Sequence, residues 1–334
     1  MSEENITKKQ HYVPQFHLKR FADERGELHI LDLKGKKILP SRAYGGVGYL
    51  KFFYAVQTGA LDDVSQQIER WLQQLEHVIA LALPGIIEKI LTDRHINDDD
   101  RYTLASFMSM LWLRSPGMRA HLNKMNEDMT KNLMSLSARK GVDEYAEATG
   151  TMPSPEARKE FLRVVESGDY NVKVNNAHHL KFMTETMGVG GPGFTNMFFG
   201  QRWRIYIAKG RKRFITSDTP VIEWWNPPES FYGASFLERN KYFALTPKIL
   251  IELTWPVGSE KVRRKTLFES DDNVVAMFNI LLASRSHEFA YTGDRGILED
   301  LLSGRTTPGP TEAAYYERFE RPWQEYRNRT GDMT

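Results

Sequence analysis

Apolar residues recur at helical spacing through the middle of the chain, from residue 62 to residue 187. Asp62 or Asp63 can cap a first long helix. Its predicted apolar face follows an i, i+4, i+7 pattern and consists of Val64, Ile68, Trp71, Leu72, Leu75, Val78 and Ile79. A shorter helical segment is expected from Gly85 to Leu91.

A second long helix is predicted to begin at Asn97 or Asp98 and to end at Ser115, because Pro116 disfavours helical geometry in the residue before it. Its predicted inward face consists of Leu104, Ala105, Phe107, Met108, Leu111 and Trp112. Further helices are expected over residues 117–138, 154–167 and 173–187, with a loose connection from Gly141 to Pro153.

The pattern changes at the glycine-rich run from Gly188 to Gly193, which suits neither a helix nor a regular strand. A hinge is the favoured interpretation, since phosphate-binding glycine loops follow a strand and this run follows a predicted helix. The remaining pattern predicts strands at residues 28–31, 36–39, 203–207, 213–216, 242–245, 249–254 and 288–291, and helices at 273–285 and 296–302.

These elements predict an α+β fold, in which a helical lobe is inserted between N-terminal elements and a mixed, largely antiparallel sheet. The predicted parts are a flexible N-terminus (1–8), the N-terminal motif with small β elements (9–60), the helical lobe (61–188), an α+β lobe (189–310), and a C-terminal aromatic helix and tail (311–334).

Composition narrows the class of protein. With 334 residues, 41% hydrophobic and 26% charged, the chain has the make-up of a soluble globular protein. The absence of cysteine excludes disulfide scaffolds, cysteine nucleophiles and thiolate metal sites. A polar, acidic N-terminus is unlike a signal peptide, and no apolar run is long enough for a membrane span. We therefore expect a cytoplasmic protein.

A dense motif lies near the N-terminus, where His-Tyr-Val-Pro-x-Phe-x-Leu-x-x-Phe-Ala occupies residues 11–22. Ile-Thr-Ser-Asp-x-Pro-Val follows at residues 215–221, and Leu-x-Pro at 245–247 precedes an apolar strand. This order resembles the domain-of-unknown-function 4238 family of mainly prokaryotic proteins of about this size, and the resemblance covers residues 8 to 292. It implies no activity and transfers no catalytic residue.

The stretch Ser217-Asp218-Thr219-Pro220 is the first candidate site, because a strand that ends before a turn exposes side chains to a ligand. Asp218 can equally be a structural turn former that satisfies its own backbone. In the functional interpretation, Asp218 and Glu252 bind a divalent cation such as Mg²⁺ or Mn²⁺, since carboxylate oxygens suit such ions. Ser217 and Thr219 would then contact substrate.

The N-terminal motif supplies the second candidate. Pro14 forces an extended or turn conformation between His11 and His17. His11 is a candidate general base or metal ligand, and Gln15 and Arg20 are candidate substrate-binding residues. The alternative is that the motif simply fills the core, which is the favoured interpretation for His17.

A basic segment from Gln201 to Phe214 is the third candidate. Arg204, Lys209, Arg211 and Lys212 lie in it among aromatic residues, and Lys209-Gly210-Arg211-Lys212 would form the tip of a hairpin. Such a ribbon suits nucleic acid or another polyanion, while the alternative is a solvated edge hairpin.

Two buried-charge candidates remain, Glu69 in the first long helix and Arg114 at the end of the second. Each can pair within the helical lobe or point towards the motif, and a structural ion pair is the favoured role.

Two functions fit these residues. The first is a hydrolase that acts on phosphodiesters or nucleotides at a site formed by the N-terminal motif and the Ser217-Asp218 turn, with His11, Asp218 and Glu252 as catalytic residues. The second is a non-catalytic recognition module that binds a polar ligand, nucleic acid or a protein partner. They differ in whether His11 and Asp218 reach each other in one open cleft.

Overall fold

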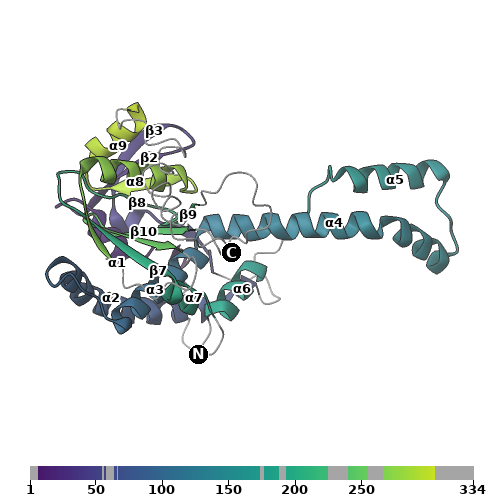
Figure 1. The fold of residues 1–334 in the computed structure, drawn as a ribbon. Helices are drawn as coiled ribbons and strands as arrows, with labels where there is room; N and C mark the ends of the chain where they lie inside the picture. Colours follow the sequence, from purple (N-terminus) through teal and green to yellow (C-terminus); the bar gives the residue numbers. More distant parts are fainter. Residues whose placement is uncertain are drawn as a thin grey trace, which may run out of the picture. The chain divides into compact units, whose positions relative to one another are not determined.

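The computed structural model describes residues 7–54, 56–57, 64–65, 67–173, 177–187, 193–224, 240–254 and 266–304 (Figure 1). By internal contacts the chain forms two compact units: Met1–Gly117 together with Thr184–Thr334, and Met118–Met183. The predicted helical region 61–188 is therefore divided, because its first two long helices belong to the unit that holds the sheets.

The largest sheet has five strands in the order β12-β7-β11-β10-β9. Strand β12 is parallel to β7, and the other neighbours are antiparallel, so the predicted mixed, largely antiparallel sheet and the α+β class are confirmed. Its strands are β7 (Arg202–Ala208), β9 (Val221–Trp224), β10 (Asn240–Thr246), β11 (Ile249–Thr254) and β12 (Leu267–Ser270).

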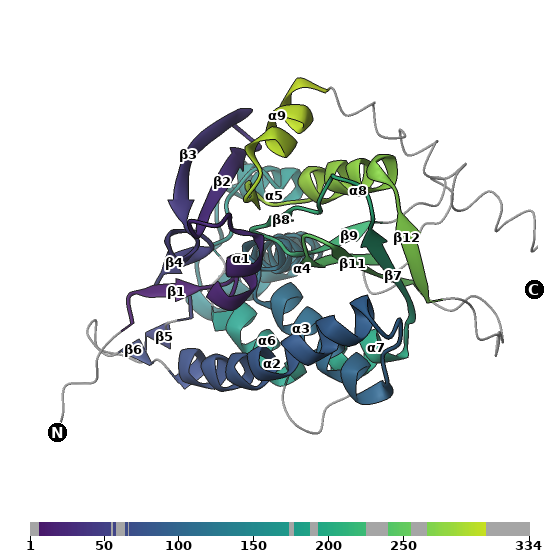
Figure 2. The same ribbon diagram turned by 90° about the vertical axis from the view of Figure 1, so that its left-hand side faces the viewer.

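Helices cover both faces of this sheet. Successive residues of a strand point to opposite faces, so Tyr242 and Phe243 of β10 show what packs on each. On one face, Tyr242 of β10 packs against Phe278 of α8 (Asp272–Ser284), with ring centroids 5.9 Å apart. On the other, Phe243 packs 5.5 Å from Phe107 of α3 (Asp98–Leu113) and 5.3 Å from His17 of α1 (Gln15–Phe21). Figure 2 shows α8 and α3 on either side of the strands.

A second sheet has four antiparallel strands in the order β3-β2-β13-β8. It brings together the beginning, middle and end of the described chain. The predicted pairing of residues 28–31 with 36–39 is confirmed. The strands of this sheet and of two small pairs are β2 (Glu27–Asp32), β3 (Lys37–Ala43), β8 (Thr216–Ser217) and β13 (Phe289–Thr292), then β1 (Lys9–His11) with β4 (Tyr49–Lys51) and β5 (Val56–Gln57) with β6 (Val64–Ser65).

The predicted hairpin around Lys209–Lys212 is wrong, because β7 and β8 belong to different sheets. The segment between them follows α8 instead. The backbone N–H of Lys212 donates to Asp272 at 2.8 Å, and Asn279 bonds the backbone of Ile215 at 3.0 Å and of Arg213 at 2.8 Å. The Asp272 carboxylate and the Asn279 amide, which accepts from Ile215 N–H and donates to the Arg213 carbonyl, replace the strand partner that a hairpin would need.

Helix α2 (Gln67–Leu91) is one continuous helix that contains Pro84, where two segments were predicted. Its buried face also differs from the prediction, since Val78 is 64% exposed while Leu72 and Ile79 are buried. The remaining helices are η1 (Tyr44–Gly46), α4 (Pro116–Thr149, which extends into the predicted connection), α5 (Pro155–Ser167), α6 (Ala177–Met187), α7 (Phe194–Gly200) and α9 (Arg295–Ser303).

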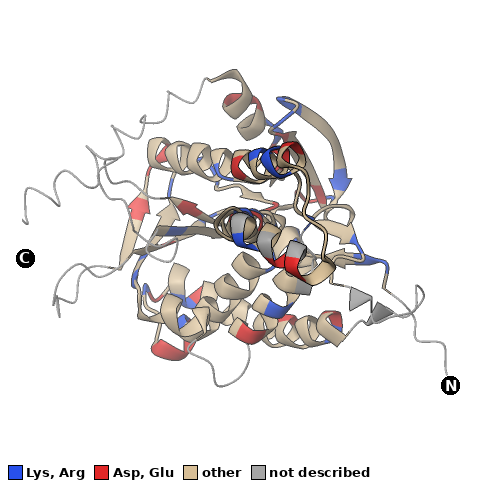
Figure 3. Cartoon of the chain, turned by 90° about the vertical axis from the view of Figure 1, so that its right-hand side faces the viewer, with Lys and Arg blue, Asp and Glu red and all other residues tan. Residues whose placement is uncertain are grey.

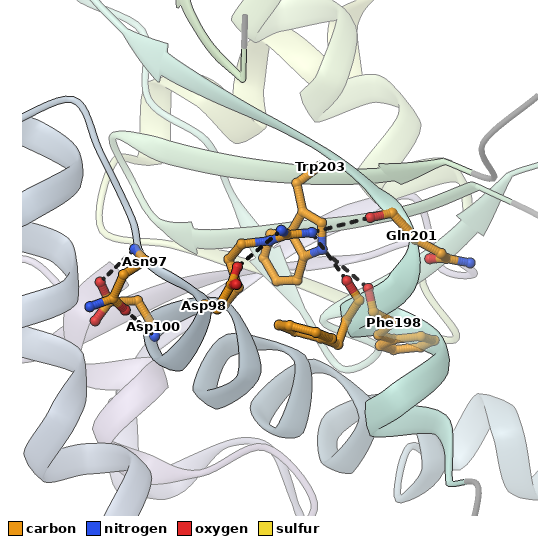
Figure 4. Close-up of polar contacts among 8 residues, drawn as sticks. Asn97, Asp98, Asp100, Phe198, Gln201 and Trp203 are labelled. Carbon is orange, nitrogen blue, oxygen red and sulfur yellow. Dashed lines mark hydrogen bonds and ion pairs between the residues drawn. The ribbon is translucent and has the colours of Figure 1, made fainter. Parts of the chain in front are cut away.

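Helix α3 is fixed at its N-terminal end by polar contacts. Asn97 and Asp100 form a reciprocal capping box, with hydrogen bonds of 2.8 and 3.1 Å (Figure 4). One turn later, Arg101 donates to the backbone oxygen of Phe199 at 3.1 Å and lies over the ring of Trp203. This end is therefore held against α7 and β7, which sets the direction of α3 towards the candidate site.

Some expectations lie outside the described residues: the helix cap at Asp62 or Asp63, the glycine-rich run at 188–192 and the aromatic tail at 311–334. Among the helices that the structure does describe, none is long and apolar enough to cross a bilayer.

The N-terminal motif is fixed by Gly48, whose backbone oxygen accepts from Tyr12 N–H at 2.9 Å and from Val13 N–H at 3.2 Å. Gly48 has a φ of +66°, and a Cβ there would lie 3.1 Å from atoms of both Leu18 and Val13. We expect Gly48→Ala to lower the free energy of unfolding by about 1–3 kcal/mol in urea denaturation, because an L side chain is strained in this region.

Gly46→Ala is the matched control, since its Cβ would meet only Arg42 Cβ at 3.7 Å, an ordinary contact. Equal stability of the two alanine variants would contradict this account of Gly48.

Candidate functional site

Asp218 lies in the turn after β8, and its carboxylate is fully used inside the protein. Oδ1 accepts from the backbone N–H of His287 at 3.0 Å, and Oδ2 accepts from those of Glu288 at 2.7 Å and Phe289 at 2.9 Å. Burial raises the pKa of Asp218, and these three donors oppose that shift. The carboxylate therefore ties the β8–β9 turn to the start of β13.

Glu252 is buried within β11 and is also occupied. Its Oε2 accepts from the Tyr206 hydroxyl at 2.7 Å and from Arg204 Nη1 at 3.2 Å. Its Oε1 accepts from the Tyr242 hydroxyl at 2.9 Å. This carboxylate holds together three strands of the five-stranded sheet.

The structure does not bring these two carboxylates into one metal site. Asp218 and Glu252 lie in separate hydrogen-bond networks attached to different sheets. Within the described ranges there is also no group of three or more His, Asp or Glu residues that could hold a metal ion. The geometry thus favours the interpretation of Asp218 as a turn former over that of a cation ligand.

The N-terminal motif does contact the Ile215–Val221 stretch, but through other side chains than His11. His17 is fully buried, and its Nε2 lies 3.0 Å from Thr216 Oγ1. The Tyr12 hydroxyl forms a hydrogen bond with Tyr291, and burial, with the nearby charge of Asp218, raises the pKa of Tyr12. The two stretches are therefore joined in the core.

His11 lies on the other side of the motif and pairs with Gln15. Gln15 Nε2 donates to His11 Nε2 at 3.1 Å, which leaves the imidazole proton on Nδ1 because an amide nitrogen only donates. The ring also packs 5.4 Å from that of Tyr49. Burial lowers the pKa of His11, the charge of Glu76 opposes this shift, and Arg114 adds to it. His11 is therefore an uncharged hydrogen-bonding group at neutral pH.

Arg114, at the C-terminal end of α3, is the largest fully buried side chain in the described structure. Its Nη1 donates to Glu76 Oε1 of α2 at 2.6 Å. Its Nε and Nη2 have no hydrogen-bond partner among the described residues. Burial alone would lower the pKa of Arg114, but Glu76, Tyr54 and Glu69 together outweigh that effect and the pKa is raised. The guanidinium therefore stays charged with donors unused.

Glu69 is the second acid on this side of α2, and its Oε1 accepts from Gln73 Nε2 at 3.2 Å. Burial raises the pKa of Glu69; the hydrogen bond from Gln73 opposes this, and the charge of Glu76 adds to it. The shifted pKa values of Glu69 and His11 are both influenced by Glu76 and Arg114, and shifted pKa values that gather around shared charges are typical of functional sites.

We call His11, Gln15, Glu69, Glu76 and Arg114 the motif cluster. Arg114 is close enough to influence the pKa of both His11 and Glu69, so one guanidinium links the motif to α2. The inward positions of α2 recur every three or four residues and are Glu69, Leu72, Glu76, Ile79, Leu83, Ile86 and Ile90. Two acids thus occupy positions that continue a buried apolar stripe.

Acidic residues at positions that continue an apolar row are the signal by which Glu76 could have been found from the sequence. Glu69 and Arg114 were identified as buried-charge candidates, and the ion pair that Arg114 forms has Glu76 as its partner. The predicted apolar face placed Val78 inward instead, which turned Glu76 towards solvent.

The other predicted ligand contacts are scattered. Ser217 is buried and its hydroxyl bonds the backbone of Thr219 in a local turn. The Thr219 hydroxyl has no described partner, and neither does Arg20 Nε. Burial lowers the pKa of Arg20, whose charge in turn contributes to the low pKa of His17. None of these side chains forms a described hydrogen bond with the motif cluster.

Most of the predicted basic ribbon is paired with acids. Arg204 contacts Glu252, Lys209 lies 3.1 Å from Glu269 and Lys212 lies 3.8 Å from Asp300, while Arg211 is exposed. In Figure 3, positive and negative positions are interspersed along the elements. Among the residues that the structure describes, the geometry adds no continuous cationic track to the nucleic-acid hypothesis.

Comparison with known proteins gives one match, in which residues 9–296 fit the family described as "Protein of unknown function (DUF4238)". No curated protein matches the chain. No solved structure matches it either.

We expect Asp218→Ala to lower the free energy of unfolding by about 3 kcal/mol, because three backbone N–H groups lose the hydrogen bonds that they make to a buried carboxylate. Thermal melts with and without Mg²⁺ or Mn²⁺ should give no metal-dependent shift in either protein. A metal-induced rise in the wild-type melting temperature that the alanine variant lacks would restore the metal-ligand hypothesis.

His17 predicts an acid-sensitive fold. Burial, with the charges of Arg20 and Arg114, lowers the pKa of His17 from 6.5 to about 3. Below pH 6.5 the unfolded chain binds a proton that the folded chain excludes, so stability falls as the pH decreases from 6.5 towards 3. The slope should be about 1.4 kcal/mol per pH unit.

Urea denaturation at several pH values measures this slope. His17→Phe should lose about that amount of pH dependence, since the aromatic neighbours Phe21, Phe107 and Phe243 accept a phenyl ring. An unchanged slope in the variant would show that another group titrates.

Proposed function

Since the chain belongs to the family described as a protein of unknown function (DUF4238), which brings no activity with it, we propose from the site alone that the protein recognises a polar ligand at the motif cluster. In this proposal a ligand group that accepts hydrogen bonds, a carbonyl, carboxylate or phosphate, binds the free donors of Arg114. The protein then acts as a recognition or sensing module.

The unused Nε and Nη2 of Arg114 carry the proposal. A buried donor without a partner costs roughly 1–3 kcal/mol, and more when it is charged. An arginine fork also matches planar acceptors with two parallel hydrogen bonds, which a lysine cannot supply. A ligand acceptor at Arg114 would therefore gain the free energy of the hydrogen bonds that Nε and Nη2 do not make within the described protein.

The exposure of the neighbouring residues supports access of a ligand to the Arg114 guanidinium. Gln15 is exposed, His11 is half-buried, and the Glu76 side chain is 22% exposed, so the cluster passes from surface to core. Glu76 already balances the charge of Arg114, so an uncharged carbonyl suffices and a net negative ligand is not required. Neutral His11 and the Gln15 amide would orient the ligand by hydrogen bonds.

A hydrolase remains the second candidate, favoured by the opposite pKa shifts of His11 and Glu69. An uncharged imidazole can act as a general base, and a carboxyl with a raised pKa can act as a general acid. Arg114 would hold a phosphodiester or nucleotide substrate. This version uses the motif cluster in place of Asp218 and Glu252, whose oxygens are occupied within the fold.

Arg114→Lys tests the proposal, because it keeps the charge for Glu76 and removes the fork. The matched control is Arg101→Lys, an arginine-to-lysine change thirteen positions earlier on the same helix, about 20 Å away. Thermal melts against phosphate, AMP, acetate and glutamine should show a ligand that raises the melting temperature of wild type and Arg101→Lys but not of Arg114→Lys. Saturation at one hundred times Kd adds about 2.7 kcal/mol of stability.

A shift that persists in Arg114→Lys would place binding elsewhere, and a wild-type protein indifferent to all four probes would contradict recognition of these acceptor classes. The same three proteins, assayed for hydrolysis of bis(4-nitrophenyl) phosphate, separate the two candidates. Turnover that falls at least tenfold in Arg114→Lys alone favours the hydrolase, while binding without turnover favours the recognition module.

A further inference from the structure

Helix α4 has one side covered within its own compact unit. Ala138 and Val142 of α4 and Val165 of α5 are buried there. Further along, Lys131 Nζ lies 5.3 Å from the centre of the Tyr170 ring, and the Tyr170 hydroxyl contacts Met134 Sδ at 3.7 Å. Figure 1 shows α5 running alongside the distal part of α4.

A line of large apolar side chains occupies the opposite side of α4, and we call it the Met–Leu stripe. Its members are Met125, Met129, Leu133 and Leu136, with exposed fractions of 46%, 56%, 55% and 82%. They follow one another at intervals of four, four and three residues, which places them within about 80° of arc at 100° per residue. On the same count, Ala138 lies about 180° from the centre of the stripe.

The charges next to the stripe are balanced inside the helix. Lys124 Nζ lies 2.7 Å from Asp128, and Lys131 Nζ lies 2.8 Å from Glu127, both at i, i+4 spacing. No surplus of either sign is left on this stretch to select an oppositely charged partner. The uncharged polar residues beside the stripe are Asn126, Thr130, Asn132 and Ser137.

We propose that the Met–Leu stripe is the contact surface between two copies of this chain. Two identical surfaces can meet only if they do not oppose like charges, and a rim of amides and hydroxyls meets that condition. Amide and hydroxyl groups both donate and accept, so they are complementary to themselves. The intervals of three and four are those by which two helices interlock their side chains.

In an antiparallel arrangement of the two helices, every side chain of the Met–Leu stripe faces an apolar side chain of the other copy. With the two-fold axis at the middle of the stripe, Met125 meets Leu136 of the partner subunit, and Met129 meets Leu133 of the partner subunit. The stripe is about 18 Å long. A stable interface buries roughly 800 Å² per partner, and four side chains on one helix bury less. The association is therefore weak and depends on concentration.

Sedimentation velocity of the full chain, from about 1 µM to 1 mM, should show a reversible monomer–dimer equilibrium. Leu136→Glu should weaken the dimer at least tenfold, because it puts a charge into the apolar contact. Ser135→Glu is the matched control, since it adds the same charge at an exposed neighbouring position about 120° from the centre of the stripe, and it should leave the equilibrium unchanged.

The cysteine-free chain permits an independent test. A mixture of Met129→Cys and Leu133→Cys chains should form a disulfide-linked dimer under mild oxidation, because these two positions face each other, whereas Ser135→Cys should not. A wild-type chain that stays monomeric at every concentration would overturn the proposal. In that case the melting temperature of the Leu136→Glu variant tells what covers the stripe. A lower melting temperature than that of the wild type would mean that the stripe is covered within one molecule. An unchanged melting temperature would mean that a different protein, or none, covers it.

Discussion

The hydrogen bond between His17 and Thr216 is the contact on which the larger unit depends. It joins residues almost two hundred positions apart in the sequence, and the imidazole is fully enclosed by aromatic rings from α1, α3 and β10. Because the ring is uncharged and its Nε2 is satisfied, the N-terminal motif can lie in the core between the two sheets. Everything that His11 and Gln15 do at the surface side of the motif rests on that anchor.

Local pattern predicted the elements whose partners are close in sequence. The pairing of residues 28–31 with 36–39 and the α+β class follow from alternation, helical spacing and turn residues, and the structure agrees. The same reasoning failed between β7 and β8, because the backbone of that segment bonds to Asp272 and Asn279, some sixty residues later. A local pattern cannot reveal a side-chain partner that only the folded chain brings near.

In the candidate site too, the features that local sequence sets were predictable, and those that depend on contacts with distant residues were not. Asp218 resembled a ligand residue because a carboxylate at the end of a strand is exposed unless something covers it, and its three backbone donors lie 69 to 71 residues away. Glu69 and Arg114 could be recognised as charges at inward helical positions. Glu76 escaped because the apolar face of α2 was placed on the wrong side, and a helix with two acids in its inward row gives an ambiguous apolar pattern.

The strand order of the four-stranded sheet also governs how the chain is made. Strand β2 pairs with β13, so Asp32 meets Phe289 only after about 250 further residues have been added. At a synthesis rate of about 5–20 residues per second, that interval is about 10–50 s. During it, one edge of β2 is an unpaired row of backbone donors and acceptors, a template for pairing with other chains. The residue order of this sheet therefore leaves that edge of β2 open to pairing with other chains for most of the time in which the protein is made.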